Sequence, residues 1–195
     1  MKKQVLTLLF LGLTLIVKSQ NSTEQVQKSS VEKSIFGIQT GFAGLWVYNE
    51  LKLSNQIALR TEIGFDAYDN DEFYPDAGFL LTTFITAEPR WYYNLNKRQS
   101  KSKRIDNNSG NFFSLKTSFR SDNLLLDFGD ANNARIVDNL AIIPTWGIRR
   151  NIGNHFNYET GLGLGYIHYF AKSSGFVKDK GEAAINLHLR IGYQF

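Results

Sequence analysis

The chain has 195 residues, of which 43% are hydrophobic and 14% aromatic, and its formal net charge is +4 at pH 7. Three lysines lie within the first 18 positions, where no acidic residue balances them, so the rest of the chain is close to +1. This balance argues against a nucleic-acid-binding surface, which requires a clustered basic face. The lack of cysteine excludes disulfide bonds and lipid attachment to cysteine, and the alternating hydropathy argues against a helical membrane protein.

The first segment has the three parts of a secretory signal peptide. Lys2 and Lys3 precede an apolar run from Val5 to Val17, and the small residue Ser19 follows. The apolar run is too short for a transmembrane helix, which needs about 20 residues. We therefore expect a signal peptide over residues 1–19, cleaved after Ser19.

The next segment, residues 20–33, is polar without periodicity and predicts a flexible periplasmic leader. One domain follows over residues 34–195, in which apolar and polar residues alternate with the period of two that is typical of strands. The alternating segments cover approximately residues 36–43, 45–53, 57–66, 79–93, 112–120, 140–148, 156–166 and 183–195.

The last segment has the clearest pattern. Apolar residues occupy every odd position from Ile185 to Phe195, and polar or small residues occupy the even positions from Asn186 to Gln194. A strand that is apolar outside, polar inside and aromatic at its end is typical of a barrel in lipid. We predict an all-β fold, an eight-stranded antiparallel up-and-down transmembrane β-barrel whose lumen is filled by side chains. A soluble β-sandwich is the alternative.

An even number of strands places both chain ends in the periplasm. The outer loops are then Tyr68–Gly78, Ser121–Asn139 and Phe170–Glu182. The inner turn Asn94–Asn111 is unusually long, and it is basic through Lys97, Arg98, Lys101, Lys103 and Arg104. This turn is interpreted as a solvated mobile loop, or as a contact to anionic head groups or cell-wall polymers.

Prolines and aromatic residues refine the prediction. Pro89 and Pro144 lie inside expected strands and cannot donate to a ladder, which predicts bulges or strand ends there. Aromatic residues near strand ends predict rings at the level of the lipid head groups. These are Trp46, Trp91, Tyr92, Tyr93, Trp146, Tyr158, Tyr166, Tyr169, Tyr193 and Phe195.

A glycine-rich segment, Gly161–Gly165, resembles a phosphate-binding loop only superficially. A phosphate loop requires a helix directly after it, whereas this segment continues as a strand. We expect its glycines to face a narrow lumen and Leu164 to face lipid. On this view Gly163→Ala should be tolerated, whereas Gly163→Trp should not.

Charged residues of the inward parity form the candidate functional set. They are Arg60, Glu62, Asp66, Glu88, Arg90, Lys116, Arg120, Arg149, Glu159 and Arg190. Buried charges are tolerated when they are paired, and the mixture of signs is nearly balanced, so a self-compensating polar network is favoured over an ion path.

Catalysis by an outer-membrane enzyme would require a histidine near a serine or carboxylate at the outer rim. His155 falls in an inner turn, His188 has lumen parity, and His168 has the lipid-facing parity, although Ser173 and Ser174 follow it. There is no metal-ligand spacing. We therefore expect no enzyme activity, no cofactor and no metal.

The chain resembles the small outer-membrane β-barrel domain proteins of Gram-negative bacteria over about Phe36 to Phe195. The resemblance rests on the signal peptide, the strand rhythm, the ending Arg190–Phe195, and the stretches Arg90–Asn94 and Pro144–Asn151. It implies insertion by the barrel-assembly machinery, which reads the final strand and its terminal aromatics, here Tyr193 and Phe195.

The same resemblance implies no reaction. We expect a monomer in the cell outer membrane, surrounded by its lipids, that acts as a structural element or binds an extracellular ligand through its outer loops. The alternatives are a narrow porin-like channel and a lipid-modifying enzyme.

Overall fold

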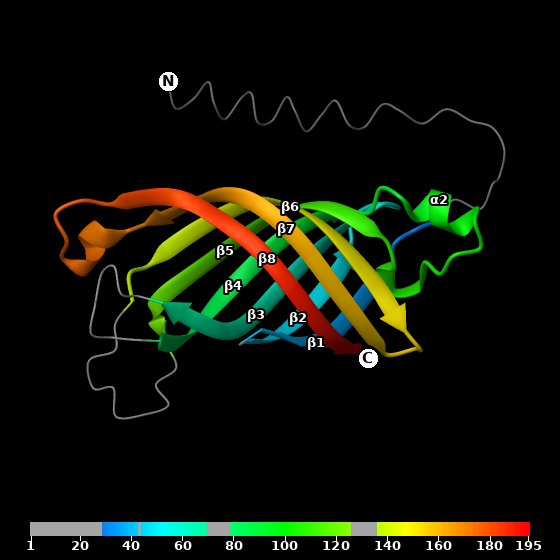
Figure 1. Cartoon of the computed structure of the whole chain (residues 1–195), viewed down its shortest axis with the longest axis horizontal. Helices are drawn as coiled ribbons and strands as arrows, with labels where there is room; N and C mark the ends of the chain where they lie inside the picture. The colour runs from blue at the N-terminus through cyan, green and yellow to red at the C-terminus, as the bar shows by residue number, and fades with distance from the viewer. Residues whose placement is uncertain (1–28, 43, 70–78, 126–135) are drawn as a thin grey trace, which may run out of the picture.

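The computed structural model describes residues 29–42, 44–69, 79–125 and 136–195. The signal peptide, most of the leader, most of the first outer loop and part of the second lie outside this range. The described residues form eight strands (Figure 1). These are β1 (Ser34–Gly41), β2 (Gly44–Lys52), β3 (Ile57–Asp69), β4 (Phe79–Trp91), β5 (Asn111–Leu125), β6 (Asn139–Ile152), β7 (Phe156–Tyr169) and β8 (Lys180–Gln194).

Each strand pairs antiparallel with the next, and β8 pairs with β1, so the sheet closes on itself. This confirms the predicted all-β, eight-stranded antiparallel up-and-down barrel. Short turns join β2 to β3 and β6 to β7, and in the first of these Leu53 N–H donates to the Ile57 carbonyl at 2.8 Å. The expected turn at Ser54–Gln56 therefore sets the β2–β3 register, which runs from Gly44 opposite Asp66 to Lys52 opposite Ala58.

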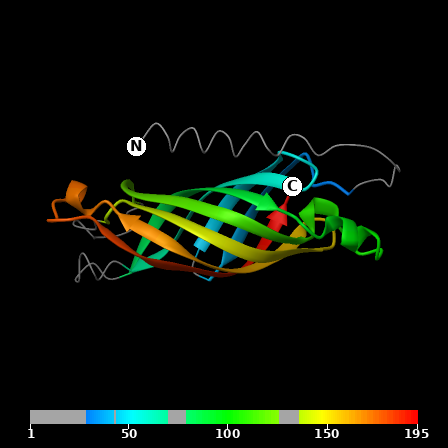
Figure 2. The same ribbon diagram turned by 90° about the horizontal axis from the view of Figure 1, so that it is seen from above.

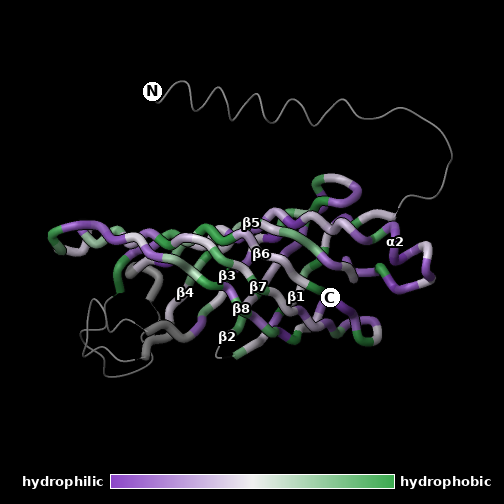
Figure 3. The backbone as a smooth tube through the Cα atoms, turned by 45° about the horizontal axis from the view of Figure 1, so that its top comes forward, coloured by the Kyte–Doolittle hydropathy of each residue, from purple (hydrophilic) through white to green (hydrophobic). Residues whose placement is uncertain are grey.

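The alternating pattern of the sequence separates the two faces of the wall. On β8, the odd-numbered residues from Ile185 to Ile191 are between 57% and 80% exposed, whereas Asn186, Arg190 and Gln194 are buried in the lumen. Hydrophobic and hydrophilic residues alternate along the strands in the same way (Figure 3). The outer face is thus apolar, and the polar groups of the barrel lie inside it.

The two prolines do not produce the expected bulges or strand ends. Pro89 lies opposite Leu59 in β3, and Pro144 lies opposite Leu115 in β5. On their other sides, pairing is interrupted locally but resumes in the same register, at Arg90 for β4 and at Thr145 for β6. The shift in register between β4 and β5 falls between Thr82 and Phe84 instead.

The prediction of an outer ring of aromatics is wrong for Trp46 and Tyr92, which are both buried inside. Trp46 has the inward parity of β2, and Gly64 leaves room for its indole, because a Cβ there would lie 2.3 Å from Trp46 Cδ1. Five other members of the set are exposed on the outer face, namely Trp91, Tyr158, Tyr166, Tyr193 and Phe195. Tyr193 lies edge-on to Phe195, with ring centroids 5.3 Å apart, and Phe195 packs against Phe36.

The connection between β4 and β5 closes one end of the barrel (Figures 1 and 2). It contains α2 (Leu95–Gln99) and η2 (Asp106–Asn108), and Leu95 is fully buried. Leu95 belongs to an apolar cluster with Val31, Ala58, Tyr92 and Phe112. The expected mobile loop is therefore, in this structure, a cap packed on the barrel end.

The last residues of the expected flexible leader also belong to this cap. Ser29 is buried and donates a hydrogen bond from Oγ to Asn96 Oδ1 at 2.6 Å. Glu32 N–H donates to Asn108 Oδ1 at 2.8 Å. Residues 29–33 thus lie against the capped end, beside the β4–β5 connection (Figure 1).

The opposite end carries the connections that were expected to face outward. β5 extends to Leu125, beyond the predicted end near Arg120. The last connection contains η3 (Ala171–Ser174), and it is tied to its neighbour by Phe170 N–H, which donates to the Asp138 carbonyl at 2.8 Å.

Candidate functional site

The lumen is filled by a network of charged side chains, and Arg90 and Glu159 form its centre. The Arg90 guanidinium donates to both oxygens of Glu159 at 2.8 Å, which is the bidentate geometry of a strong pair. Arg90 also pairs with Glu88 at 2.8 Å. These charges come from β4 and β7, so the pair bridges the barrel from wall to wall.

A second group of ion pairs is formed around Glu62 of β3. Arg60 Nε and Arg190 Nη1 donate to the same Glu62 oxygen, at 3.0 and 2.9 Å. Arg60 also donates to Gln39 Oε1 at 2.6 Å. The Arg190 guanidinium lies over the Trp46 ring, 4.0 Å from its centroid, which adds a cation–π contact.

A third group surrounds Arg149 of β6, near the capped end. Its guanidinium donates to Glu50 Oε2 at 3.1 Å, to the Tyr48 hydroxyl at 2.7 Å and to Gln194 Oε1 at 3.0 Å. The Tyr92 hydroxyl donates to the other Glu50 oxygen at 2.6 Å. Glu50 is therefore a network member that our sequence analysis missed, although it shares the inward parity of Trp46 and Tyr48.

The remaining predicted residues lie toward the open end. Arg120 of β5 pairs with Asp66 of β3 at 2.6 Å. Lys116 of β5 is different, because the described residues offer it no hydrogen bond or ion pair within the usual distances. The structure thus brings most of the predicted charges into one network and leaves Lys116 beside it.

The charges of the described lumen do not quite balance. The cations are Arg60, Arg90, Lys116, Arg120, Arg149 and Arg190, and the anions are Glu50, Glu62, Asp66, Glu88 and Glu159. Six positive groups face five negative ones, apart from the pair of Lys180 with Glu182 at the rim, whose side chains are slightly more than one third exposed. Lys116 accounts for the excess.

Water does not reach the central layer of this network. Arg60, Arg149, Glu50 and Glu159 have 0% of their surface exposed. Hydrogen bonds and ion pairs replace most of the water that such groups would otherwise bind, although Arg60 Nη1 and Arg149 Nε have no hydrogen-bond partner. The network therefore joins opposite walls of the barrel and fills the space between them.

The basic turn forms the outer surface of the cap. Lys97, Lys101 and Lys103 are exposed, whereas Arg98 donates to the Arg104 carbonyl at 2.7 Å. Arg104 pairs with Asp106 at 2.6 Å, and this hydrogen bond lowers the pKa of the Asp106 carboxyl. Three lysines therefore remain available at this end for an anionic surface.

The three histidines lie in separate parts of the barrel. His155 stacks on Tyr193, with ring centroids 5.2 Å apart, and His168 lies edge-on to Phe170. His188 Nε2 is 3.5 Å from Glu159 Oε1 inside the lumen. Among the described residues, no group of three acidic, histidine or cysteine side chains is placed to hold a metal ion.

Comparisons with protein-family models, curated proteins and solved structures gave no match to this chain. In the part of the chain that the structure describes, no helix is long and apolar enough to cross a membrane.

Proposed function

We propose that the protein spans the outer membrane of a Gram-negative bacterium as a closed barrel, and that it acts without catalysis, as a structural element that presents its outer loops to ligands. One observation carries the proposal. The wall is apolar on its outer face and charged on its inner face, the reverse of a water-soluble domain. A lipid environment accounts for both faces at once.

The size of the outer apolar surface supports this location. On the neighbouring strands β7 and β8, Leu162, Leu164 and Leu187 are 59% to 80% exposed, and each pairs with another apolar residue across the ladder. In water, a continuous apolar patch of this kind is unfavourable and promotes association. In a bilayer, the same side chains contact acyl chains.

The ends of the barrel support an orientation. The capped end combines the C-terminus with the turns at Leu53–Gln56 and Gly153–His155, and the other end carries the connections after β3, β5 and β7. Outer-membrane barrels have short periplasmic turns and longer outer loops. We infer that the cap faces the periplasm.

The filled lumen favours a structural barrel over a narrow channel. An ion crossing the layer of Arg60, Arg90 and Arg149 would have to displace bidentate and shared ion pairs that water does not reach. Separating a buried pair in this way costs about 3–5 kcal/mol. We therefore expect no steady conductance through the barrel centre.

Two measurements test this proposal. In fractionated cells, the protein should sediment with the outer membrane and should migrate differently on a gel before and after boiling, as folded barrels do. Recovery in the soluble periplasmic fraction would overturn the location. In planar bilayers the refolded protein should give no conductance steps, whereas discrete steps would establish the narrow channel instead.

A further inference from the structure

The wall of the barrel has a notch where the β1–β2 hairpin ends. β1 pairs with β8 only between Gly37 opposite Gln194 and Gly41 opposite Arg190. β8 begins at Lys180, so its residues before Arg190 extend beyond the hairpin, and among the described strands they have a neighbour only in β7. On the other side of the hairpin, β3 likewise extends beyond Asp66.

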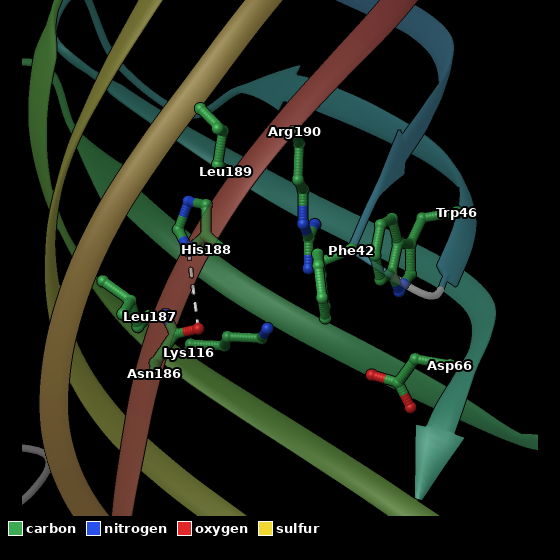
Figure 4. A pocket seen from close by; sticks show the side chains of 9 residues that line it. All are labelled: Phe42, Trp46, Asp66, Lys116, Asn186, Leu187, His188, Leu189 and Arg190. Atoms are coloured by element: carbon green, nitrogen blue, oxygen red, sulfur yellow. Dashed lines mark hydrogen bonds between the residues drawn. The ribbon is translucent and has the colours of Figure 1, made fainter. Parts of the chain in front are cut away.

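This notch leads into a cavity of about 150 Å³ inside the wall (Figure 4). Phe42 at the hairpin tip and Leu187 and Leu189 of β8 form its outer lip. Lys116 and Arg190 reach into the same space from β5 and β8. A cavity of this size holds several water molecules or one head group of phosphate size.

The inner part of the cavity is positively charged. Lys116 has no hydrogen bond or ion pair among the described residues. Arg190 is paired with Glu62 through Nη1 at 2.9 Å, and its Nε is buried without a hydrogen bond. His188 lines the same space. The carboxylate in the lining, Asp66, is neutralised by Arg120 at 2.6 Å. Among the described lumen residues, the cation in excess, Lys116, therefore lies at this site, where its charge attracts an anion.

The lip of the cavity is apolar and lies within the apolar outer face. Leu187 is 80% exposed and Phe42 fully exposed, and Leu187 lies opposite Leu162 in the middle of β7. In lipid, the backbone groups of β8 that have no partner among the described strands would lack water beside this lip, which is unfavourable for exposed polar groups. A polar head group inside the notch would supply hydrogen-bond partners for these backbone groups, while its acyl chain would cover Leu187 and Leu189.

We propose that the notch between β8 and the β1–β2 hairpin binds an amphiphile with an anionic phosphate or carboxylate head, which enters laterally from the membrane. Lys116 and Arg190 hold the head, and Phe42, Leu187 and Leu189 contact the first part of the chain. This inference rests on the proposed membrane location.

The binding test uses the full mature chain, refolded in uncharged maltoside micelles. Trp46 lines the cavity, whereas Trp91 and Trp146 lie near Tyr93 at the capped end. In a Trp91→Phe, Trp146→Phe background, Trp46 fluorescence therefore reports on the site alone. Dodecyl phosphate should change this fluorescence saturably, whereas dodecanol and inorganic phosphate, each lacking one half of the ligand, should bind at least tenfold more weakly.

Two substitutions and their matched controls locate the binding. Lys116→Gln should weaken dodecyl phosphate binding about tenfold or more, as expected for the loss of one charge-assisted contact. Lys97→Gln, at an exposed lysine of the cap, should have no effect. Phe42→Ser should weaken binding, whereas Leu53→Ser, at an exposed residue of the opposite turn, should not.

The other outcomes contradict the proposal in different ways. If inorganic phosphate binds as tightly as dodecyl phosphate, the site binds a soluble anion, and the proposal of an amphiphilic ligand is wrong. If dodecanol binds equally well and Lys116→Gln has no effect, the chains only coat the outer face. If the folded barrel binds none of them, the notch proposal fails alone. If the chain does not fold in micelles at all, the membrane proposal and this inference fail together.

Discussion

At the scale of single residues, Glu159 is the acceptor on which the central cations converge. Arg90 binds it at 2.8 Å, and Arg60 and Arg149 lie 3.7 and 3.8 Å away. Glu159→Gln should lower the free energy of unfolding by about 3–5 kcal/mol, because it leaves buried guanidinium groups without their shared anion. The measurement is urea unfolding of the refolded protein in lipid vesicles, followed by tryptophan fluorescence.

The matched control for Glu159 is Glu182→Gln at the rim. Glu182 pairs with Lys180, but both side chains are more than one third exposed, so the loss should stay within about 1 kcal/mol. Equal effects of the two substitutions would contradict a dry, tightly coupled network in the lumen.

Gly163 has less space for a side chain than its inward parity indicates. Parity places it inward and predicts that an alanine is tolerated there, but a Cβ at this position would lie 2.4 Å from the Pro144 carbonyl oxygen and 2.5 Å from Thr145 Oγ1. Backbone of β6 cannot move aside as a flexible side chain would. Gly163→Ala should therefore destabilise the barrel by about 1–3 kcal/mol in the same urea assay. Wild-type stability of this variant would show that β6 and β7 lie further apart.

At the scale of elements, the seam between β1 and β8 depends on the end of the chain. Phe195 N–H donates to the Phe36 carbonyl at 2.9 Å, and the two rings pack with centroids 5.7 Å apart. Deleting Phe195 removes these contacts together with the terminal aromatic that we expect the assembly machinery to read. The amount of folded protein in the outer membrane should fall, and unfolded chain should accumulate in the periplasm.

Measurements in cells and after refolding in vitro distinguish an effect on assembly from an effect on stability in the chain without Phe195. If Phe195 acts as an assembly signal, its deletion should lower the yield in cells more than it lowers the urea midpoint of protein refolded in vitro. Phe195→Tyr, which keeps an aromatic ring, should restore the yield. Equal yields from the deletion and the wild type would refute a role in assembly.

The elements that alternation alone determines were predictable from the sequence. The eight strands and the closed order followed from period-two patterning, and so did the inward charges from Arg60 to Arg190. Glu50 and Trp46 share the inward parity of β2, and this parity places both in the lumen although Trp46 is aromatic and lies near a strand end. Parity within a strand is the stronger signal in this fold, since one step along the chain reverses the face.

The cap was not predictable for a different physical reason. Leu95 and Ile105 are isolated apolar residues in a basic segment, and their partners Val31, Ala58 and Phe112 are scattered along the chain. No local period links such residues, and their burial follows only from the closed barrel, which brings the leader and the β4–β5 connection to the same end. The prediction of bulges or strand ends at Pro89 and Pro144 is wrong for a related reason. One proline can interrupt a few strand pairs without shifting the register.

Substitutions at Leu164 distinguish whether lipid or water surrounds the outer face of the barrel. Leu164 is 67% exposed near the middle of β7. In a bilayer, arginine there should lower the free energy of unfolding by about 2–4 kcal/mol, whereas Leu164→Phe should be nearly neutral. The measurement is urea unfolding in lipid vesicles.

The same substitution at a second exposed leucine provides the control. Leu53 is 61% exposed, but it lies in the β2–β3 turn, outside the apolar part of the wall. If lipid surrounds the wall, Leu53→Arg should be tolerated and Leu164→Arg should not, because Leu164 lies in the apolar part of the wall and Leu53 lies in a turn outside it. If water surrounds the wall, both arginines should be harmless, and a vesicle experiment with that result would remove the basis for the membrane location and for the lateral notch.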